Sequence, residues 1–211
     1  MYHLYYGPGT AAMGVHAALE EIGEPFEIHP VDISQPRTPE YLRVNPHGKV
    51  PTLVVGDDAT DPTHALYQCA AILLYLADKH PEAKLAPTPG SFARGLCDQH
   101  LFLMAEALQP AYMMHFYSER FTADPEQAPG VAAKGAELVD GIWKHLDGVV
   151  GAGPWLLGAD FSVCDIYMHM LSLWHQPHHT PLTEYPNVSA ALARIGARPA
   201  VRRMYERAYP G

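Results

Sequence analysis

Gln68 and Cys69 are of residue types, and in a position, that could do chemistry. They follow a short β-rich run at residues 65–67 and precede a helical run that begins at Ala70. Backbone N–H groups and the helix dipole at such a turn suit a carboxylate. A thiol at a helix N-terminus is also expected to have a lowered pKa, which would make Cys69 reactive toward a disulfide. The alternative is that Cys69 contributes only its backbone N–H.

Val50-Pro51 is a second candidate for ligand binding. The cis form of an X-Pro bond costs only about 0.5–1 kcal/mol relative to the trans form. A cis bond here would turn the Val50 amide and carbonyl outward, where they could pair with the extended backbone of a peptide ligand. The alternative is an ordinary trans proline that opens the strand at residues 52–55.

His175-Gln176-Pro177-His178-His179 has closely spaced imidazoles and could be considered as a metal site. No Cys, Asp or Glu lies beside these histidines, and protein zinc sites commonly add such ligands. The proline favours a solvated loop. We therefore expect no metal here.

The first part of the chain alternates strands with helices. The sequence predicts strands at residues 2–6, 26–31, 52–55 and 65–67, and helices at residues 15–22, 39–44 and 70–80. Val15, Ala18, Leu19 and Ile22 recur at helical spacing, and Gly23 is a helix stop signal. The predicted order is βαβ, then α, then ββα.

From Ser91 onward the β-rich runs are absent, and the sequence predicts an all-α region punctuated by Pro and Gly. Its clearest local signal surrounds Ser162, which can cap a helix, while Asp165 can reach back to it. Phe161 and Ile166 occupy the staple positions that set the entry angle of the chain.

Bulk properties exclude several classes of function. The 211 residues suit one large or two small domains. A net charge of −9 disfavours binding to nucleic acid or anionic membranes. No apolar run is long enough for a membrane span, and the first residues lack a basic signal-peptide start, so we expect a cytoplasmic protein. The three cysteines, without a Cys-x-x-Cys, disfavour a disulfide scaffold and dithiol chemistry.

Four segments together resemble the cytosolic glutathione S-transferases, in particular the bacterial beta-like members. Residues 45–53 resemble the segment that carries the family's cis-proline, and residues 68–72 resemble the turn that follows it. Residues 161–166 resemble the capping box of the helical domain, and residues 198–201 resemble the closing helix. The four segments occur in the family's order.

The resemblance implies an α/β domain followed by an all-α domain. Residues 1–81 would form a thioredoxin-like, glutathione-binding domain of order βαβαββα, residues 82–90 a linker, and residues 91–211 a helical domain carrying an electrophile pocket. It also implies glutathione as co-substrate, a homodimer, and conjugation of glutathione to a small hydrophobic electrophile. The alternatives are a glutathione-dependent lyase, isomerase or peroxidase, or a ligand carrier with little catalysis.

The resemblance also places residues at the glutathione. Val50 would pair with its cysteinyl backbone, and Gln68 and Cys69 would meet its γ-glutamyl end. The alternative for Lys49 is a solvated surface charge. The full predicted set is Gln35, Lys49, Val50, Pro51, Gln68 and Cys69.

Activation of the thiol requires a lowered pKa, and each pKa unit below about 8.5 requires about 1.4 kcal/mol of differential stabilisation. Ala11 aligns with the cysteine of beta-like members, and Gln109 aligns with their histidine. Thr10 aligns with a serine of related bacterial sequences and is the leading catalytic candidate, with Tyr6 second. Alternatively, Thr10 is a helix cap and Tyr6 a packing residue.

The second substrate is expected between the two domains, on aromatic and Met side chains that suit an adaptable apolar pocket. The same residue types equally suit the interface between the domains or a core. The predicted pocket residues are Tyr112, Met113, Phe116 and Trp174.

Overall fold

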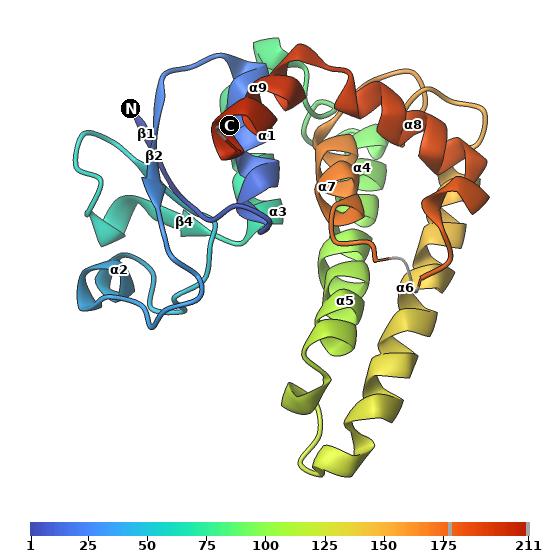
Figure 1. Cartoon of the computed structure of the whole chain (residues 1–211). Coiled ribbons are helices and arrows are strands. Elements are labelled where there is room, and N and C mark those ends of the chain that lie inside the picture. The colour runs from blue at the N-terminus through green and yellow to red at the C-terminus, as the bar shows by residue number, and fades with distance from the viewer. Residues whose placement is uncertain (177–178, 210–211) are drawn as a thin grey trace. The chain divides into compact units, whose positions relative to one another are not determined.

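The computed structural model describes residues 1–176 and 179–209. The chain divides into two compact units (Figure 1). The first consists of Met1–Ala86 together with the C-terminal segment from Gly196, and the second is Pro87–Ile195. Each unit is described by itself.

The first unit is built on a four-stranded sheet, within the described residues, of order β2-β1-β3-β4. Strand β1 (Tyr2–Tyr6) pairs in parallel with β2 (Phe26–Pro30) and antiparallel with β3 (Thr52–Val55), which pairs antiparallel with β4 (Ala65–Tyr67). The helices are α1 (Ala12–Ile22), α2 (Pro39–Val44) and α3 (Cys69–Lys79). The predicted thioredoxin-like order βαβαββα is confirmed.

Helix α1 is covered on nearly all sides, because α3 and α9 (Pro199–Ala208) both pack against it. Its residues from Ala12 to Glu20 are buried, which is typical of an interior helix. Gly23 ends it with φ of 81°, and the Gly23 N–H donates to the Leu19 carbonyl at 2.9 Å. The left-handed conformation favours glycine at this position.

Helix α9 belongs to the first unit and lies against α1 (Figure 1). Charged side chains join the two helices. Glu20 is buried and accepts from Arg203 Nε at 2.7 Å, and Arg207 lies 3.0 Å from its other oxygen. Arg198 NH2 donates to Glu21 at 2.9 Å. This segment was expected in the helical domain of residues 91–211, whereas α9 packs against α1 of the first unit.

The second unit is helical, as predicted from Ser91 onward. Its α-helices are α4 (Phe92–Leu103), α5 (Gln109–Phe116), α6 (Ala128–Val150), α7 (Val163–Ser172) and α8 (Pro186–Gly196). A π-helical turn at Met104–Leu108 joins α4 to α5. It lies where Pro110 cannot donate a helical hydrogen bond to the Glu106 carbonyl.

Short 3₁₀ turns complete the structure of both units. They are Pro62–His64, Pro81–Ala83, Ser118–Arg120, Pro125–Gln127 and Leu182–Glu184. Among the described residues, no helix combines the length and apolar character needed to cross a membrane.

The predicted capping box at α7 is confirmed. The Ser162 side chain accepts from the Cys164 N–H at 3.2 Å, and Asp165 accepts from the Ser162 N–H at 2.9 Å. Asp165 also accepts from the Leu156 N–H at 2.8 Å. Burial nevertheless raises the pKa of Asp165 to about 6. The cap therefore also ties the preceding loop to the helix.

Candidate functional site

Strand register brings the candidate residues of the first unit to one end of the sheet. Tyr5 pairs with Thr52, and Thr52 pairs with Tyr67, so the end of β1, the start of β3 and the end of β4 lie in one row. The turn after β1, the peptide before β3 and the turn after β4 must therefore start from the same edge. These three connections carry Thr10, Val50-Pro51 and Gln68-Cys69.

The Val50-Pro51 peptide bond is cis, which confirms the prediction. Pro51 is buried and Val50 is half-buried. Buried side chains hold this segment from inside the protein: Tyr41 OH donates to the Lys49 carbonyl at 2.7 Å, and Asn45 Nδ2 donates to the same oxygen at 2.9 Å. The backbone at this position is therefore fixed by hydrogen bonds on its protein side.

Gln68 has a backbone conformation that side chains rarely adopt, with φ of 73° and ψ of 110°. It is exposed and precedes α3, and its side chain makes no capping hydrogen bond. The first N–H groups of a helix lack partners within the helix. An uncommon backbone conformation at an exposed helix start is an observation that supports a binding role.

Cys69 is the first residue of α3, and its side chain is buried. Burial raises the pKa of the Cys69 thiol, and a backbone hydrogen bond from Val15 opposes this only in part. The expectation of a lowered pKa at the helix N-terminus is wrong, because loss of solvation outweighs the helix dipole. Cys69 contributes to this turn through its backbone.

Thr10 lies in the turn between β1 and α1 and is half-buried. Its hydroxyl donates to the Gly7 carbonyl at 2.6 Å and accepts from the Ala12 N–H at 3.2 Å. The Thr10 side chain thus orders the turn, and the Met13 N–H donates to the Thr10 carbonyl at 3.1 Å. Ala11 and Ala12 follow at the start of the helix and offer no reactive group.

Tyr6 is the last residue of β1 and is buried at 4 % exposure. Its ring packs edge-on against His16 with centroids 5.3 Å apart. Burial raises the pKa of its phenol, with Tyr209 and Tyr205 adding to the effect, so the phenolate form is disfavoured. Within the described part of the chain, the Tyr6 hydroxyl has no hydrogen-bond partner.

Gln35 and Lys49 are both exposed. Gln35 lines a hollow of about 380 Å³ on the α2 side of the sheet, together with Tyr5, Arg37 and Tyr41. None of Thr10, Val50 and Gln68 lines this hollow.

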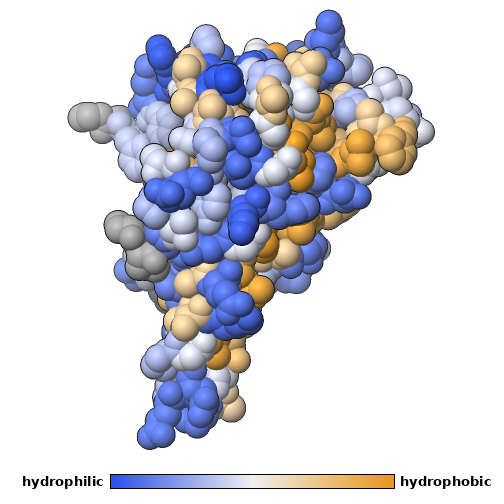
Figure 2. All heavy atoms as spheres, turned by 90° about the vertical axis from the view of Figure 1, so that its right-hand side faces the viewer, coloured by the Kyte–Doolittle hydropathy of each residue, from blue (hydrophilic) through white to orange (hydrophobic). Residues whose placement is uncertain are grey.

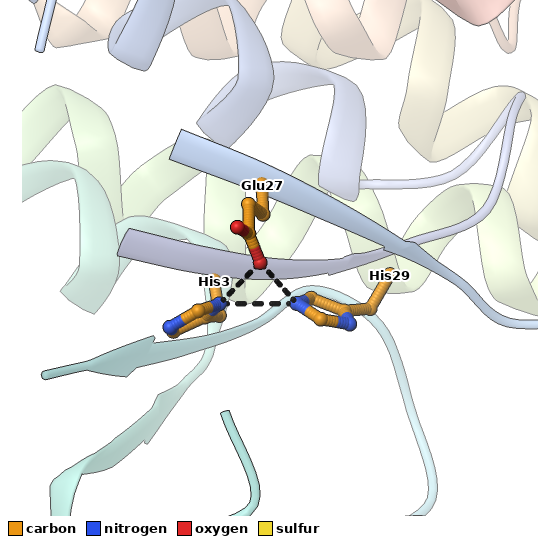
Figure 3. Close-up of side chains that lie close together, drawn as sticks. All are labelled: His3, Glu27 and His29. Atoms are coloured by element: carbon orange, nitrogen blue, oxygen red, sulfur yellow. Dashed lines mark hydrogen bonds and ion pairs between the residues drawn. The ribbon is translucent and has the colours of Figure 1, made fainter. Parts of the chain in front are cut away.

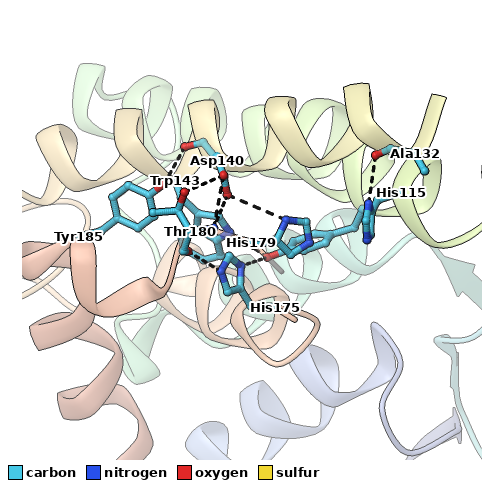
Figure 4. Close-up of polar contacts among 9 residues, drawn as sticks. His115, Ala132, Asp140, Trp143, His175, His179, Thr180 and Tyr185 are labelled. Atoms are coloured by element: carbon cyan, nitrogen blue, oxygen red, sulfur yellow. Dashed lines mark hydrogen bonds and ion pairs between the residues drawn. The ribbon is translucent and has the colours of Figure 1, made fainter. Parts of the chain in front are cut away.

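In the second unit, Tyr112 belongs to the interior. It is fully buried. Its hydroxyl accepts a hydrogen bond from Trp143 Nε1 at 2.8 Å and donates one to His175 Nδ1 at 2.9 Å. His175 Nε2 in turn donates to the Thr180 carbonyl at 2.8 Å, and Thr180 Oγ1 donates to Asp140 at 2.7 Å (Figure 4). Tyr112 is thus a structural member of a polar network rather than a pocket wall.

The other predicted pocket residues are accessible. Phe116 is 37 % exposed, and Met113 and Trp174 are half-buried. The Phe116 ring stacks on Tyr112 with centroids 5.9 Å apart. Gln109, at the start of α5, accepts a hydrogen bond from Tyr167 OH.

The histidine-rich segment is only partly described, since Pro177 and His178 lie outside the described residues. His175 belongs to the polar network, and His179 Nδ1 lies 3.9 Å from Asp140 (Figure 4). A different group of possible metal ligands, which no local pattern in the sequence indicates, lies on the sheet: His3, Glu27 and His29.

Comparison with known proteins places this architecture in a family. The family model described as "Glutathione S-transferase, N-terminal domain" matches residues 10–79. A sphingomonad glutathione S-transferase solved in complex with glutathione is 31 % identical, with a TM-score of 0.84 and 98 % of each chain covered. The chain belongs to the glutathione S-transferase family.

Two further relatives agree with this assignment. The beta-class glutathione S-transferase of Sphingomonas chungbukensis is 29 % identical, with a TM-score of 0.83 over 98 % of each chain. Glutathione S-transferase GstA of Escherichia coli O157:H7 is 27 % identical over 94 % of each chain. The resemblance stated from the sequence is confirmed, as is the prediction that the protein is a glutathione transferase.

Proposed function

We propose that this glutathione S-transferase binds glutathione at the end of the sheet defined by Tyr5, Thr52 and Tyr67, and transfers its thiolate to a small hydrophobic electrophile. The observation that carries the proposal is the convergence of three connections at that edge through strand register. Two of them offer backbone hydrogen-bonding groups and the third offers a hydroxyl.

Recognition of glutathione would rest mainly on backbone groups. The γ-glutamyl carboxylate would accept from the first N–H groups of α3, and the exposed Gln68 side chain would receive the ammonium. The backbone of Val50, next to Pro51, would pair with the cysteinyl residue as an added strand. Lys49 and Gln35 would meet the glycine carboxylate at the other end, where a positive charge at Lys49 is favourable.

Thiolate stabilisation would use the N-terminus of α1 and the Thr10 hydroxyl. The hydroxyl proton donates to the Gly7 carbonyl in the free protein and would turn to the sulfur when glutathione binds. We prefer Thr10 to Tyr6, because Tyr6 is packed against His16 in the interior. A charge-assisted hydrogen bond of this kind contributes about 1.5–3 kcal/mol.

The electrophile would contact Met113, Phe116 and Trp174, with Tyr112 supporting Phe116 from behind through ring stacking. These side chains offer apolar surface and an adaptable thioether, which suit varied hydrophobic acceptors. The structure gives no charged group among them, so we expect a neutral apolar acceptor.

We also propose a homodimer in the cytoplasm. Hydrophobic side chains lie at the surface on the face that Figure 2 shows. Helix α4 also carries two exposed aromatic side chains, Phe92 at 84 % and Phe102 at 49 %. Large exposed apolar residues suit an interface between copies of the chain. The three cysteines are unpaired, which suits a reducing compartment.

Isothermal titration with glutathione tests the binding site. Gln68→Ala should weaken glutathione binding, whereas Gln99→Ala, an exposed glutamine on α4, should leave it unchanged. Lys49→Met should weaken binding, with Lys144→Met on α6 as its control. Equal affinities in all four variants would refute this placement of the ligand.

Ultraviolet absorbance of the bound thiolate then tests transfer chemistry. A thiolate signal at neutral pH, followed by conjugation in a panel of apolar electrophiles, is the expected result. Binding without a thiolate signal would instead indicate a ligand carrier. Turnover of peroxides but not of electrophiles would indicate the peroxidase alternative.

A further inference from the structure

His3, Glu27 and His29 form a compact cluster on two neighbouring strands (Figure 3). Strands β1 and β2 are parallel, His3 pairs with Glu27, and His29 pairs with Tyr5. Residues two apart on a strand share a face, and so do paired residues on adjacent strands. The register therefore points all three side chains to the same side of the sheet, and Figure 3 shows them directed toward one another.

The three ligand atoms lie close to the corners of a zinc coordination polyhedron. His3 Nδ1 is 3.2 Å from Glu27 Oε2 and 3.1 Å from His29 Nε2, and His29 Nε2 is 3.7 Å from Glu27 Oε2. A tetrahedron around Zn²⁺ with bonds of about 2.0–2.1 Å has edges of about 3.3–3.4 Å. The observed separations bracket this length, so one ion could reach all three atoms without rearrangement of the strands.

We propose that His3, Glu27 and His29 bind one Zn²⁺ ion, which ties the edge strand β2 to β1. Two imidazoles and one carboxylate are a known zinc ligand set, and water would complete the tetrahedron. Strand β2 lies at the edge of the sheet and has β1 as its neighbouring strand there. The ion would therefore add a cross-link to a strand that pairs on one side.

The surroundings leave the cluster open to an ion and hold one of its rings in place. His3 is buried, His29 is partly buried, and Glu27 is about half exposed, which leaves a route from solvent. Tyr5 packs against the His29 ring with centroids 5.1 Å apart and restricts its orientation.

The cluster adjoins the end of the sheet that carries the proposed glutathione site, because His29 pairs with Tyr5 and packs against its ring. His3 itself lies two residues before Tyr5, about 7 Å along the strand at 3.3 Å per residue, and none of the three ligand residues is assigned to glutathione. The ion would therefore stabilise the fold without taking part in thiol chemistry. Binding of zinc to the folded state alone raises the melting temperature as zinc concentration rises.

The test is zinc titration of chelator-treated protein by calorimetry, using ZnCl₂ alone. Wild type should bind one ion, and Glu27→Gln and His29→Ala should each weaken binding by at least about tenfold. His64→Ala is the matched control, because His64 forms an exposed pair with Asp61 at 2.7 Å that is not part of the cluster. It should bind zinc like wild type.

Three results would overturn the proposal: no saturable binding to wild type, equal affinity in all variants, or loss of binding only in His64→Ala. The first would leave the cluster as a hydrogen-bonded group that shares a proton. Co²⁺ in place of Zn²⁺ provides a second readout, since a tetrahedral site gives intense visible absorption and an octahedral spectrum would contradict the geometry. The buried His3 is not substituted, because its replacement could disturb folding. Circular dichroism and titration with glutathione check, independently of zinc, that the variants fold.

Discussion

Gly135→Ala and Gly141→Ala make the same change in the same helix, α6, yet should shift stability in opposite directions. A Cβ at Gly135 would lie 2.7 Å from the His115 nitrogen and 2.9 Å from the Ala111 carbonyl oxygen, both backbone atoms of α5. A Cβ at Gly141 would meet nothing within 4 Å. Gly135 therefore permits the close approach of α5 and α6.

The two magnitudes decide the signs. Replacing Gly by Ala inside an exposed helix stabilises by about 0.8–1 kcal/mol, which Gly141→Ala should gain in full. At Gly135 the same gain is opposed by overpacking of about 1–3 kcal/mol, toward the upper end because backbone atoms cannot change rotamer. Gly135→Ala should thus lower the free energy of unfolding by about 1–2 kcal/mol.

Urea and thermal unfolding followed by circular dichroism measure both changes. At about 2–4 °C per kcal/mol for a chain of this size, the two variants should differ in Tm by several degrees. Gly135→Ala should also raise KM for the electrophile more than for glutathione, because α5 carries Met113 and Phe116. Equal or greater stability of Gly135→Ala relative to Gly141→Ala would refute the close-approach argument.

Three further predictions concern single side chains. Thr10→Val should raise the pKa of the bound glutathione thiol by about 1–2 units, whereas Thr10→Ser should keep this pKa low. An unchanged pKa of the bound thiol in thiolate absorbance titrations of Thr10→Val would exclude Thr10 from the mechanism. Burial lowers the pKa of His16 to about 4, so the folded state binds fewer protons than the unfolded state and stability falls as pH falls from about 6.5 to 4. In unfolding titrations at pH 6.5 and pH 4, His16→Phe should therefore lose up to about 3 kcal/mol less of its free energy of unfolding than the wild type. Identical pH profiles of the two proteins would contradict this prediction. Native Cys69 should react with iodoacetamide no faster than free cysteine at neutral pH, as judged by mass spectrometry, and faster labelling would contradict the role of burial.

Local signals account for what could be predicted. The cis peptide at Val50-Pro51, the capping box of Ser162 and Asp165, and the stop at Gly23 each depend on residues near one another in the sequence. Hydrophobic periodicity likewise placed the strands and helices of the first unit. Such features follow from backbone preferences and short-range hydrogen bonds, which the sequence states directly.

The features of the site that could not be predicted depend on the protein environment of each side chain. Cys69 and Tyr112 have residue types that suit a binding or catalytic site. However, the Cys69 thiol is desolvated, and the Tyr112 side chain is enclosed in a hydrogen-bonded network. Neither helix position nor residue type reports how much surrounding protein covers a side chain. Burial reverses the expected direction of the Cys69 pKa because solvation is set by residues distant in the sequence.

The sequence by itself determined the family, the order of the elements and the turns that carry the proposed glutathione site. Only the tertiary structure decided that the segment from Gly196 packs with the first unit, and that His3 meets Glu27 and His29. The strand containing Glu27 and His29 was predictable, but its register against β1 was not. A shift of one residue in that register would turn His3 to the opposite face from Glu27, so pairing between strands far apart in the chain creates the cluster.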